Sequence, residues 1–233
     1  MFTLYKKELS YYFNNAIGYI IVGLFAVFAN FLFVKDIFVN GTTSMRSFFS
    51  LLPWLFLVFI PAISMRVLAE EKRNNTIEVL LTLPVSETQI VLAKFFALLT
   101  LVFLGLFLTL GLPISLAFLS KVYLPEILIG YLGALLMGAG LIGVAIFFSS
   151  QTKNQVVAFL SSVLAIFFFL ILTTDFLSSV LPKFLQDICN YFGPVYHLQN
   201  FVKGIIDVRS LFYFLSLTLV FLFLTIVDLE KRS

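Results

Sequence analysis

The stretch RVLAEEKRNNTIEVLLTLPVSETQIVLAK, residues 66–94, lies between two long apolar runs and decides how the chain is interpreted. It holds eight of the twenty-seven charged residues of the chain in twenty-nine positions. Of all 233 residues only 12% are charged and 61% are hydrophobic, and the mean hydropathy is +1.08. An ordinary soluble domain carries roughly 25% charged residues. The composition therefore predicts an integral membrane protein.

Six long apolar runs are candidates for membrane-spanning helices. A helix needs about 20 residues to cross a hydrocarbon layer of about 30 Å. The resulting prediction is an all-α, polytopic fold in which residues 1–233 form a single transmembrane domain. The six spans are expected at about 16–34, 47–65, 90–120, 127–152, 154–174 and 210–227.

Two further segments are expected to be helical without spanning. Residues 2–13 place apolar side chains at helical spacing opposite Lys6 and Lys7, which is typical of a helix that lies in the membrane interface. Residues 175–209 are too apolar for a solvated linker, and Gly193-Pro194 divides them. They are expected to form short helices at the outer leaflet.

The distribution of basic residues favours one orientation. With both termini in the cytoplasm, nine Lys and Arg residues lie inside and six lie outside, on longer loops. Positive charge accumulates on the cytoplasmic side of membrane proteins. We therefore expect both termini to be cytoplasmic.

A short helix is expected at about 74–84. Asn75 and Glu78 have the spacing of a capping box, Leu80 and Leu81 contribute to an apolar face, and Pro84 ends the pattern. This segment is too short to span a membrane. Its core carries Glu78 as the only charge, whereas a helix that rests on lipid is usually rimmed by Lys and Arg. A protein partner fits this pattern better than a solvated loop, which remains the alternative.

Ser86 and Gln89 have the spacing of a second capping box, which would begin the third span at a defined residue. The whole stretch resembles the loop between the second and third spans of ABC-type export permeases of the second class. Residues 192–217, FGPVYHLQNFVKGIIDVRSLFYFLSL, are similar to gliding-motility-associated permeases and to their relatives in nitrous oxide reductase maturation. The positions that carry the loop pattern are Arg66, Glu71, Arg73, Thr76, Glu78, Leu80, Leu81, Pro84, Val85, Ser86 and Lys94.

The resemblance implies a permease subunit of the bacterial cytoplasmic (inner) membrane. Its partners would be a dimeric cytoplasmic ABC ATPase, which binds ATP and Mg, and a second permease subunit, identical or related. The chain has no G-x-x-x-x-G-K-(S/T) phosphate loop, so it is not expected to be an enzyme or to hold a cofactor. The residues implied in coupling to the ATPase are Arg66, Glu70, Glu71, Arg73, Thr76, Glu78, Leu80, Leu81, Pro84 and Ser86. The alternative is a non-transporting subunit that passes ATP-driven motion to an envelope partner, as in gliding motility or secretion.

Other classes of protein have weaker support. The expected spans have no charged residue in the middle, which argues against an ion-coupled carrier, although a carrier that uses backbone carbonyls near residues 111–113 stays open. No catalytic motif such as H-E-x-x-H or G-x-S-x-G occurs, and neither a metal site nor nucleic-acid binding is expected. A copper-handling role for Cys189 and His197 is the less favoured interpretation of these two residues.

Gly130, Ala134 and Gly138 form a small-xxx-small pattern in the fourth expected span. Small residues let two helices approach closely in lipid. The pattern indicates close helix packing, either within one subunit or between two subunits, and the first is favoured.

Overall fold

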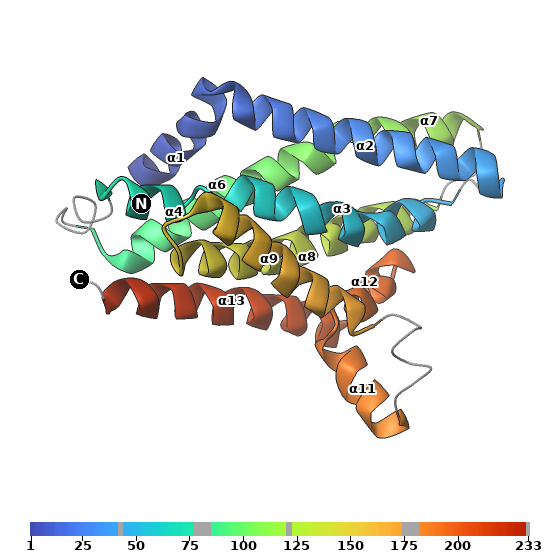
Figure 1. Ribbon diagram of the computed structural model, residues 1–233. Helices are drawn as coiled ribbons and strands as arrows, with labels where there is room; N and C mark the ends of the chain where they lie inside the picture. The colour runs from blue at the N-terminus through green and yellow to red at the C-terminus, as the bar shows by residue number, and fades with distance from the viewer. Residues whose placement is uncertain (42–43, 77–84, 120–122, 174–181, 232–233) are drawn as a thin grey trace.

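The computed structural model describes residues 1–41, 44–76, 85–119, 123–173 and 182–231. Within these ranges every regular element is a helix and no strand occurs, in agreement with the predicted all-α class. The helices form an elongated bundle (Figure 1).

Five stretches of helix are long and apolar enough to cross a membrane, as expected for an integral membrane protein. They are built on α2 (Ala16–Asn40), α3 (Arg46–Ser64), α6 (Glu87–Leu108), α8 (Leu124–Ser150) and α13 (Val208–Glu230). A turn at Thr109 separates α6 from α7 (Gly111–Leu119), and the two together form one of the five stretches.

The remaining expected span, the fifth in chain order at 154–174, coincides with α9 (Gln155–Ile171). This helix is apolar but has 17 residues, fewer than the roughly 20 that an upright span requires. Six crossings therefore remain a prediction.

Short helices occupy the other expected segments. They are α1 (Phe2–Asn14), α4 (Ala69–Arg73), α11 (Lys183–Phe192) and α12 (Pro194–Val202), and Gly193 separates the last two. Where these helices lie relative to a bilayer stays a prediction. The expected helix at 74–84 falls outside the described residues from residue 77 onward.

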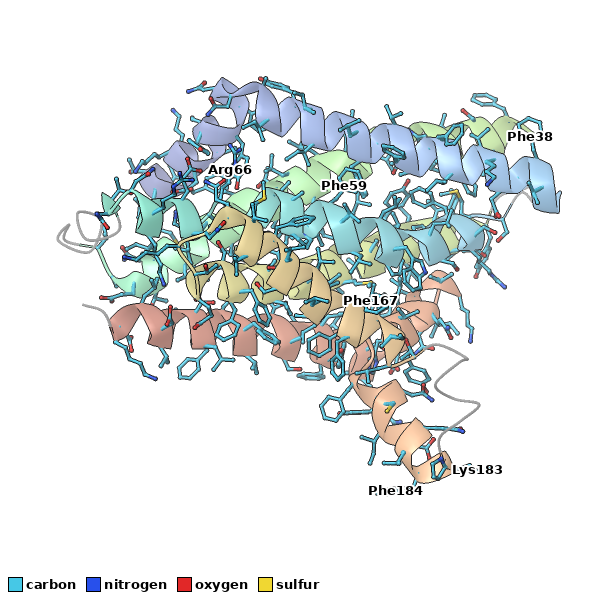
Figure 2. All side chains as sticks on the ribbon, viewed as in Figure 1. Phe38, Phe59, Arg66, Phe167, Lys183 and Phe184 are labelled. Carbon is cyan, nitrogen blue, oxygen red and sulfur yellow. The ribbon has the colours of Figure 1, made fainter. Side chains whose placement is uncertain are left out.

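Helix α8 is the centre of the bundle, because it packs against α3, α6, α9, α12 and α13. Its small residues make this possible. Gly133 faces Phe201 of α12, and Gly140 faces Leu217 of α13. By contrast, α2 and α13 lie on opposite flanks and keep most of their apolar side chains exposed, such as Phe38 (Figure 2). Exposed apolar flanks are what a lipid environment requires.

The bundle has two distinct ends. Helix α1, helix α4 and the C-terminal part of α13 lie at one end, which we call the α4 end, and α11 and α12 lie at the other, which we call the α12 end (Figure 1). Both ends of the described chain are therefore at the α4 end. From α2 to α13 the chain passes between the two ends through α2, α3, α6 with α7, α8, α9 and α13.

Candidate functional site

Helix α4 is fastened to the end of α8 by the hydroxyl of Ser149. Ser149 Oγ accepts hydrogen bonds from the backbone N–H groups of Leu68 and Ala69, both at 3.2 Å, and lies 3.3 Å from the carbonyl oxygen of Met65. The first N–H groups of a helix have no partner within that helix. Ser149 is fully buried, so it supplies the partner that water cannot.

A buried lysine connects α4 to α6 and α1. Lys94 of α6 is only 2% exposed, and its Nζ lies 2.7 Å from Oε1 of Glu71 and 3.0 Å from Oε1 of Glu8. Removing an ammonium group from water costs several kcal/mol unless it is paired. The two carboxylates, one from α4 and one from α1, supply that pairing.

A second buried lysine connects α4 to α8 and α13. Lys72 is also 2% exposed, and its Nζ lies 3.1 Å from Oδ2 of Asp228, close to the end of α13. The same Nζ donates to the carbonyl oxygen of Ser150, the last residue of α8. A cation is favoured there because the last carbonyl groups of a helix lack partners and carry partial negative charge.

Glu71 and Lys72 are sequence neighbours, so on a helix their side chains point about 100° apart. Glu71 therefore reaches Lys94 of α6, which in turn binds Glu8 of α1, while Lys72 reaches α8 and α13 on the other side. Helix α4, which has only five residues, is thus linked to four other helices. We call Glu8, Glu71, Lys72, Lys94 and Asp228 the ionic clamp (Figures 1 and 2 show the helices that it joins).

A polar cavity of about 250 Å³ lies beside the clamp, between α1, α4 and α6. Arg66 and Glu71 both line it, and Arg66 Nε and Glu71 Oε2 are buried atoms without a hydrogen-bond partner among the described residues. Buried polar atoms of this kind are usually satisfied by water, and a cavity of this size is large enough for several molecules. The cavity can therefore hold water that hydrates Arg66 and Glu71.

Two tyrosines of α1, Tyr11 and Tyr12, also line this cavity. Tyr12 is buried and donates from its hydroxyl to the carbonyl oxygen of Ile63 at 2.6 Å, while the Tyr11 hydroxyl donates to Glu70 Oε2 at 3.2 Å. Burial raises the pKa of both phenols, so they stay protonated as donors. Helix α1 is thereby attached to the end of α3 as well as to α4.

The described coupling residues gather around this site. Arg66, Glu70 and Glu71 line the cavity, and so does Thr76, whose hydroxyl lies 3.3 Å from the carbonyl oxygen of Glu71. Arg73 is exposed. The residues that lie outside the described part are Glu78, Leu80, Leu81 and Pro84.

The two expected capping positions have different outcomes. Ser86 begins α6, and its Oγ accepts from the backbone N–H of Gln89 at 3.4 Å, as expected. Asn75 has a φ of +56°, whereas a helix-capping residue at an N-terminus has extended backbone. The next residue, Thr76, is helical, so a helix does begin after Asn75, but Asn75 lacks the extended backbone of a capping residue, and Glu78 of the expected capping box lies outside the described residues. Asn75 follows the end of α4 in the left-handed conformation that asparagine tolerates better than most residues.

Sequence reasoning missed most of the ionic clamp. Lys94 belongs to the loop pattern but was given no role, and Lys72, Glu8 and Asp228 were not selected. A usable signal was present, because these charges stand at the edges of spans in a charge-poor chain. Their pairing could not be read, since Lys72 and Asp228 are 156 positions apart.

The small residues of α8 face neighbours within the chain. A methyl group at Gly130 would overlap the ring of Phe49 in α3, and one at Gly138 would lie 3.1 Å from Val102 of α6. Ala134 is completely buried. Gly130 and Gly138 therefore lie where α8 comes close to α3 and α6.

At the α12 end, His197 is part of a separate polar network. Its ring stacks on Tyr213 at a centroid distance of 4.1 Å, and its Nε2 and Nδ1 lie 2.9 Å from the Tyr191 carbonyl oxygen and 3.1 Å from Ser210 Oγ. A carbonyl only accepts, so Nε2 carries the proton of the neutral ring, and Nδ1 faces the Ser210 hydroxyl, whose single proton lies between Nδ1 and Oδ2 of Asp207. Burial lowers the pKa of His197. Both ring nitrogens therefore have protein partners, and Cys189 is not one of them.

The sequence matches the family described as ABC-2 family transporter protein over residues 30–227. No curated protein matches the sequence. The matched range includes Glu71, Lys72 and Lys94, while Glu8 precedes it and Asp228 follows it directly.

Proposed function

This chain belongs to the ABC-2 family of transporter proteins, and from that membership we propose that it is the permease subunit of an ATP-driven export complex. The ATP and Mg sites belong to a separate dimeric cytoplasmic ABC ATPase. This division is supported by the sequence, which contains no phosphate loop. The permease works beside a second permease subunit, identical or related.

The observation that carries this proposal is the ionic clamp on α4. The segment at 74–84, which we assign as the coupling helix, directly follows α4 and ends two residues before Ser86, the N-cap of α6. A displacement of this helix by the ATPase reaches α1 and α6 through Glu71, and α8 and α13 through Lys72. The coupling segment is thus connected to the helices that a transport pathway has to move.

The proposed orientation places the α4 end in the cytoplasm of a bacterial cell, with the protein in the inner membrane. Both ends of the described chain lie at this end, which agrees with six crossings in which α9 is the short fifth span. The basic residues support the same choice, because nine of the fifteen Lys and Arg residues then face the cytoplasm.

A second candidate function is transmission of motion to an envelope partner without transport, as in gliding motility. The observation that favours it is α11, which projects from the bundle and has no buried residue (Figure 1). Its apolar residues Phe184, Ile188 and Tyr191 are all exposed. Such a face could receive a partner at the outer surface, and the ionic clamp would serve this function equally.

The proposed coupling helix is tested by changing Leu80 and Leu81 together to Asp and measuring how much ATPase copurifies with the permease. A buried unpaired carboxylate costs several kcal/mol, and about 1.4 kcal/mol already weakens binding tenfold. We expect the ATPase to be lost. The matched control changes Ile205 and Ile206, two exposed neighbours at the α12 end, to Asp. Unchanged recovery of ATPase with the Leu80 and Leu81 variant, at equal membrane expression, would rule out this helix as the docking element.

A further inference from the structure

A long groove runs along one face of α13 at the α12 end. It has a volume of about 710 Å³, with Phe169 of α9 and Tyr191 and Phe192 of α11 as its walls. Its floor is the α13 face that begins at Arg209 and ends at Phe221. Figure 1 shows that α11 leaves the bundle at an angle to α13.

The length of the groove corresponds to one leaflet of a bilayer. Twelve residues separate Arg209 from Phe221, which on a helix is roughly 18 Å. Half of a hydrocarbon layer of about 30 Å is about 15 Å. Because α13 is one of the candidate membrane spans and Arg209 is its second residue, the groove begins at the edge of the layer and runs toward its middle.

The groove is mostly apolar beyond its outer end, and the hydroxyl of Ser216, which also lines it, donates to the carbonyl oxygen of Tyr213 at 2.9 Å. Arg209 is the only charged residue among the described ones that line it. The hydroxyl of Tyr213 donates to the carbonyl oxygen of Phe192 at 2.5 Å, so it offers no donor to a ligand. A groove with one cation at the water side and aromatic rings behind it is complementary to an anionic amphiphile. The charged head group of such a molecule would meet the cation, and its apolar chain would meet the rings.

Asp207 is the acidic residue closest to Arg209 in the sequence. Among the described contacts, its carboxylate forms no ion pair with the guanidinium of Arg209. Asp207 Oδ2 lies 3.1 Å from Nδ2 of Asn200 and 3.2 Å from Oγ of Ser210, and its Oδ1 accepts from the backbone N–H of Arg209. Asp207 is thus engaged on the α12 side of α13. The exposed guanidinium of Arg209 can therefore receive another anion, and phosphate suits its planar array of donors.

We propose that this groove is a binding site for one anionic phospholipid. The phosphate lies at Arg209, and one acyl chain follows the rings of Phe212 and Phe169 toward Phe221. The site fixes a lipid at the surface of the permease in the leaflet next to the α12 end. It is independent of what the complex transports and of whether it transports.

The test uses tryptophan fluorescence of the full-length permease in vesicles. The single tryptophan, Trp54, is changed to Phe, and Phe212→Trp places a probe in the groove. Quenching is compared between brominated phosphatidylglycerol and brominated phosphatidylcholine in the same phosphatidylcholine vesicles. We expect half-maximal quenching by the anionic lipid at a roughly fivefold lower mole fraction, which is the effect of one favourable ion pair.

Three control variants decide the interpretation. Leu219→Trp places the probe on an exposed part of α13 that does not line the groove, and both lipids should quench it alike. Adding Arg209→Gln to the groove probe should abolish the preference, whereas Lys203→Gln, which removes an exposed charge outside the groove, should keep it.

Several results would overturn the proposal. One is equal quenching of the groove probe by the two lipids, and another is a preference that survives Arg209→Gln. A groove probe that neither lipid quenches, while the Leu219→Trp probe is quenched, would show that a protein or a second copy of the chain covers the groove.

Discussion

Lys94 of α6 and Glu71 of α4 form a 2.7 Å ion pair in which the lysine is only 2% exposed. Glu8 of α1 lies on the same ammonium group at 3.0 Å. One cation thus holds together the helix that precedes the proposed coupling segment, the helix that follows it and the N-terminal helix. Replacing Lys94 therefore tests the contacts of all three helices at once.

Changing Lys94 to Met should strongly destabilise the protein, because it leaves two carboxylates facing each other without a cation. Removing one partner of a buried ion pair typically costs about 3–5 kcal/mol. Thermal unfolding in detergent measures the effect. Lys153→Met is the matched control, since Lys153 is exposed, and it should leave the unfolding midpoint nearly unchanged. Equal midpoints for the two variants would mean that the Lys94 pairs contribute nothing.

Lys72 and Arg73 offer a comparison between neighbours in the same helix. Lys72 is buried against Ser150 and Asp228, whereas Arg73 is exposed. We expect Lys72→Met to accelerate hydrogen exchange in α4 and to lower the coupling of ATP hydrolysis to the permease. Arg73→Met should change stability by less than about 0.5 kcal/mol. Similar exchange rates in both variants would contradict a role for Lys72 in fastening α4.

The packing of α8 predicts opposite outcomes for two glycines. Gly130→Ala should destabilise the protein by about 1–3 kcal/mol, because the added methyl group overlaps the Phe49 ring. Gly23→Ala in α2 should leave stability unchanged or raise it by up to about 1 kcal/mol, since nothing lies within 4 Å of the new methyl group and alanine favours helix. Unfolding midpoints measured under the same conditions compare the two. A Gly130→Ala variant as stable as the native protein would show that α3 and α8 do not meet as described.

The α12 end should lose stability in acid. Burial lowers the pKa of His197 below its ordinary value of 6.5, while the Tyr191 carbonyl and the charge of Asp207 oppose the shift. Because the folded protein binds this proton less readily than the unfolded chain, the stabilisation is complete above about pH 6.5 and is lost as the pH falls through the folded value.

This pH dependence is measured as hydrogen exchange of α12 at neutral and at mildly acidic pH, corrected for the intrinsic exchange rate. His197 is the only histidine, so His197→Gln removes all histidine titration from the chain. We expect acid to accelerate exchange in the native protein and not in the variant. The same acceleration in both would assign the effect to other groups.

Thiol labelling tests the proposed orientation. In a Cys189→Ser background, a cysteine at Lys153 should react with an impermeant reagent only after the cytoplasmic side is opened, because residue 153 lies at the α4 end. A cysteine at Lys183, at the start of α11, should react from the outside. The reversed pattern would place the α12 end in the cytoplasm and would remove the α4 end from the reach of an ATPase.

Much of the fold could be predicted from local sequence patterns. Apolar length located the long helices, and Gly193-Pro194 located the boundary between α11 and α12. Both features are local. The length of an apolar run decides whether a helix can span, and a proline cannot continue the helix that precedes it. The short length of α9 was not anticipated, because the charge-free run continues to residue 174, three residues past the end of the helix.

The candidate site was predictable only in part. Charge density pointed to residues 66–94, and Arg66, Glu70, Glu71 and Thr76 do meet at one cavity. The partners of Lys72 and Lys94 come from α1 and α13, at the two ends of the chain, so no local pattern could identify them. Asn75 shows the limit of a spacing rule, since a helical residue does follow it, but its left-handed backbone is not the extended one that the rule assumes.

The opposite charges of Glu71 and Lys72 also guard against errors of register while the chain assembles. If α4 slipped by one residue in one direction, Lys72 would arrive beside Lys94. A slip in the other direction would bring Glu71 beside Asp228. Each error places like charges together in a site shielded from water, where such repulsion is strong. Two adjacent residues therefore disfavour both neighbouring misalignments, so that α4 is assembled in a single alignment.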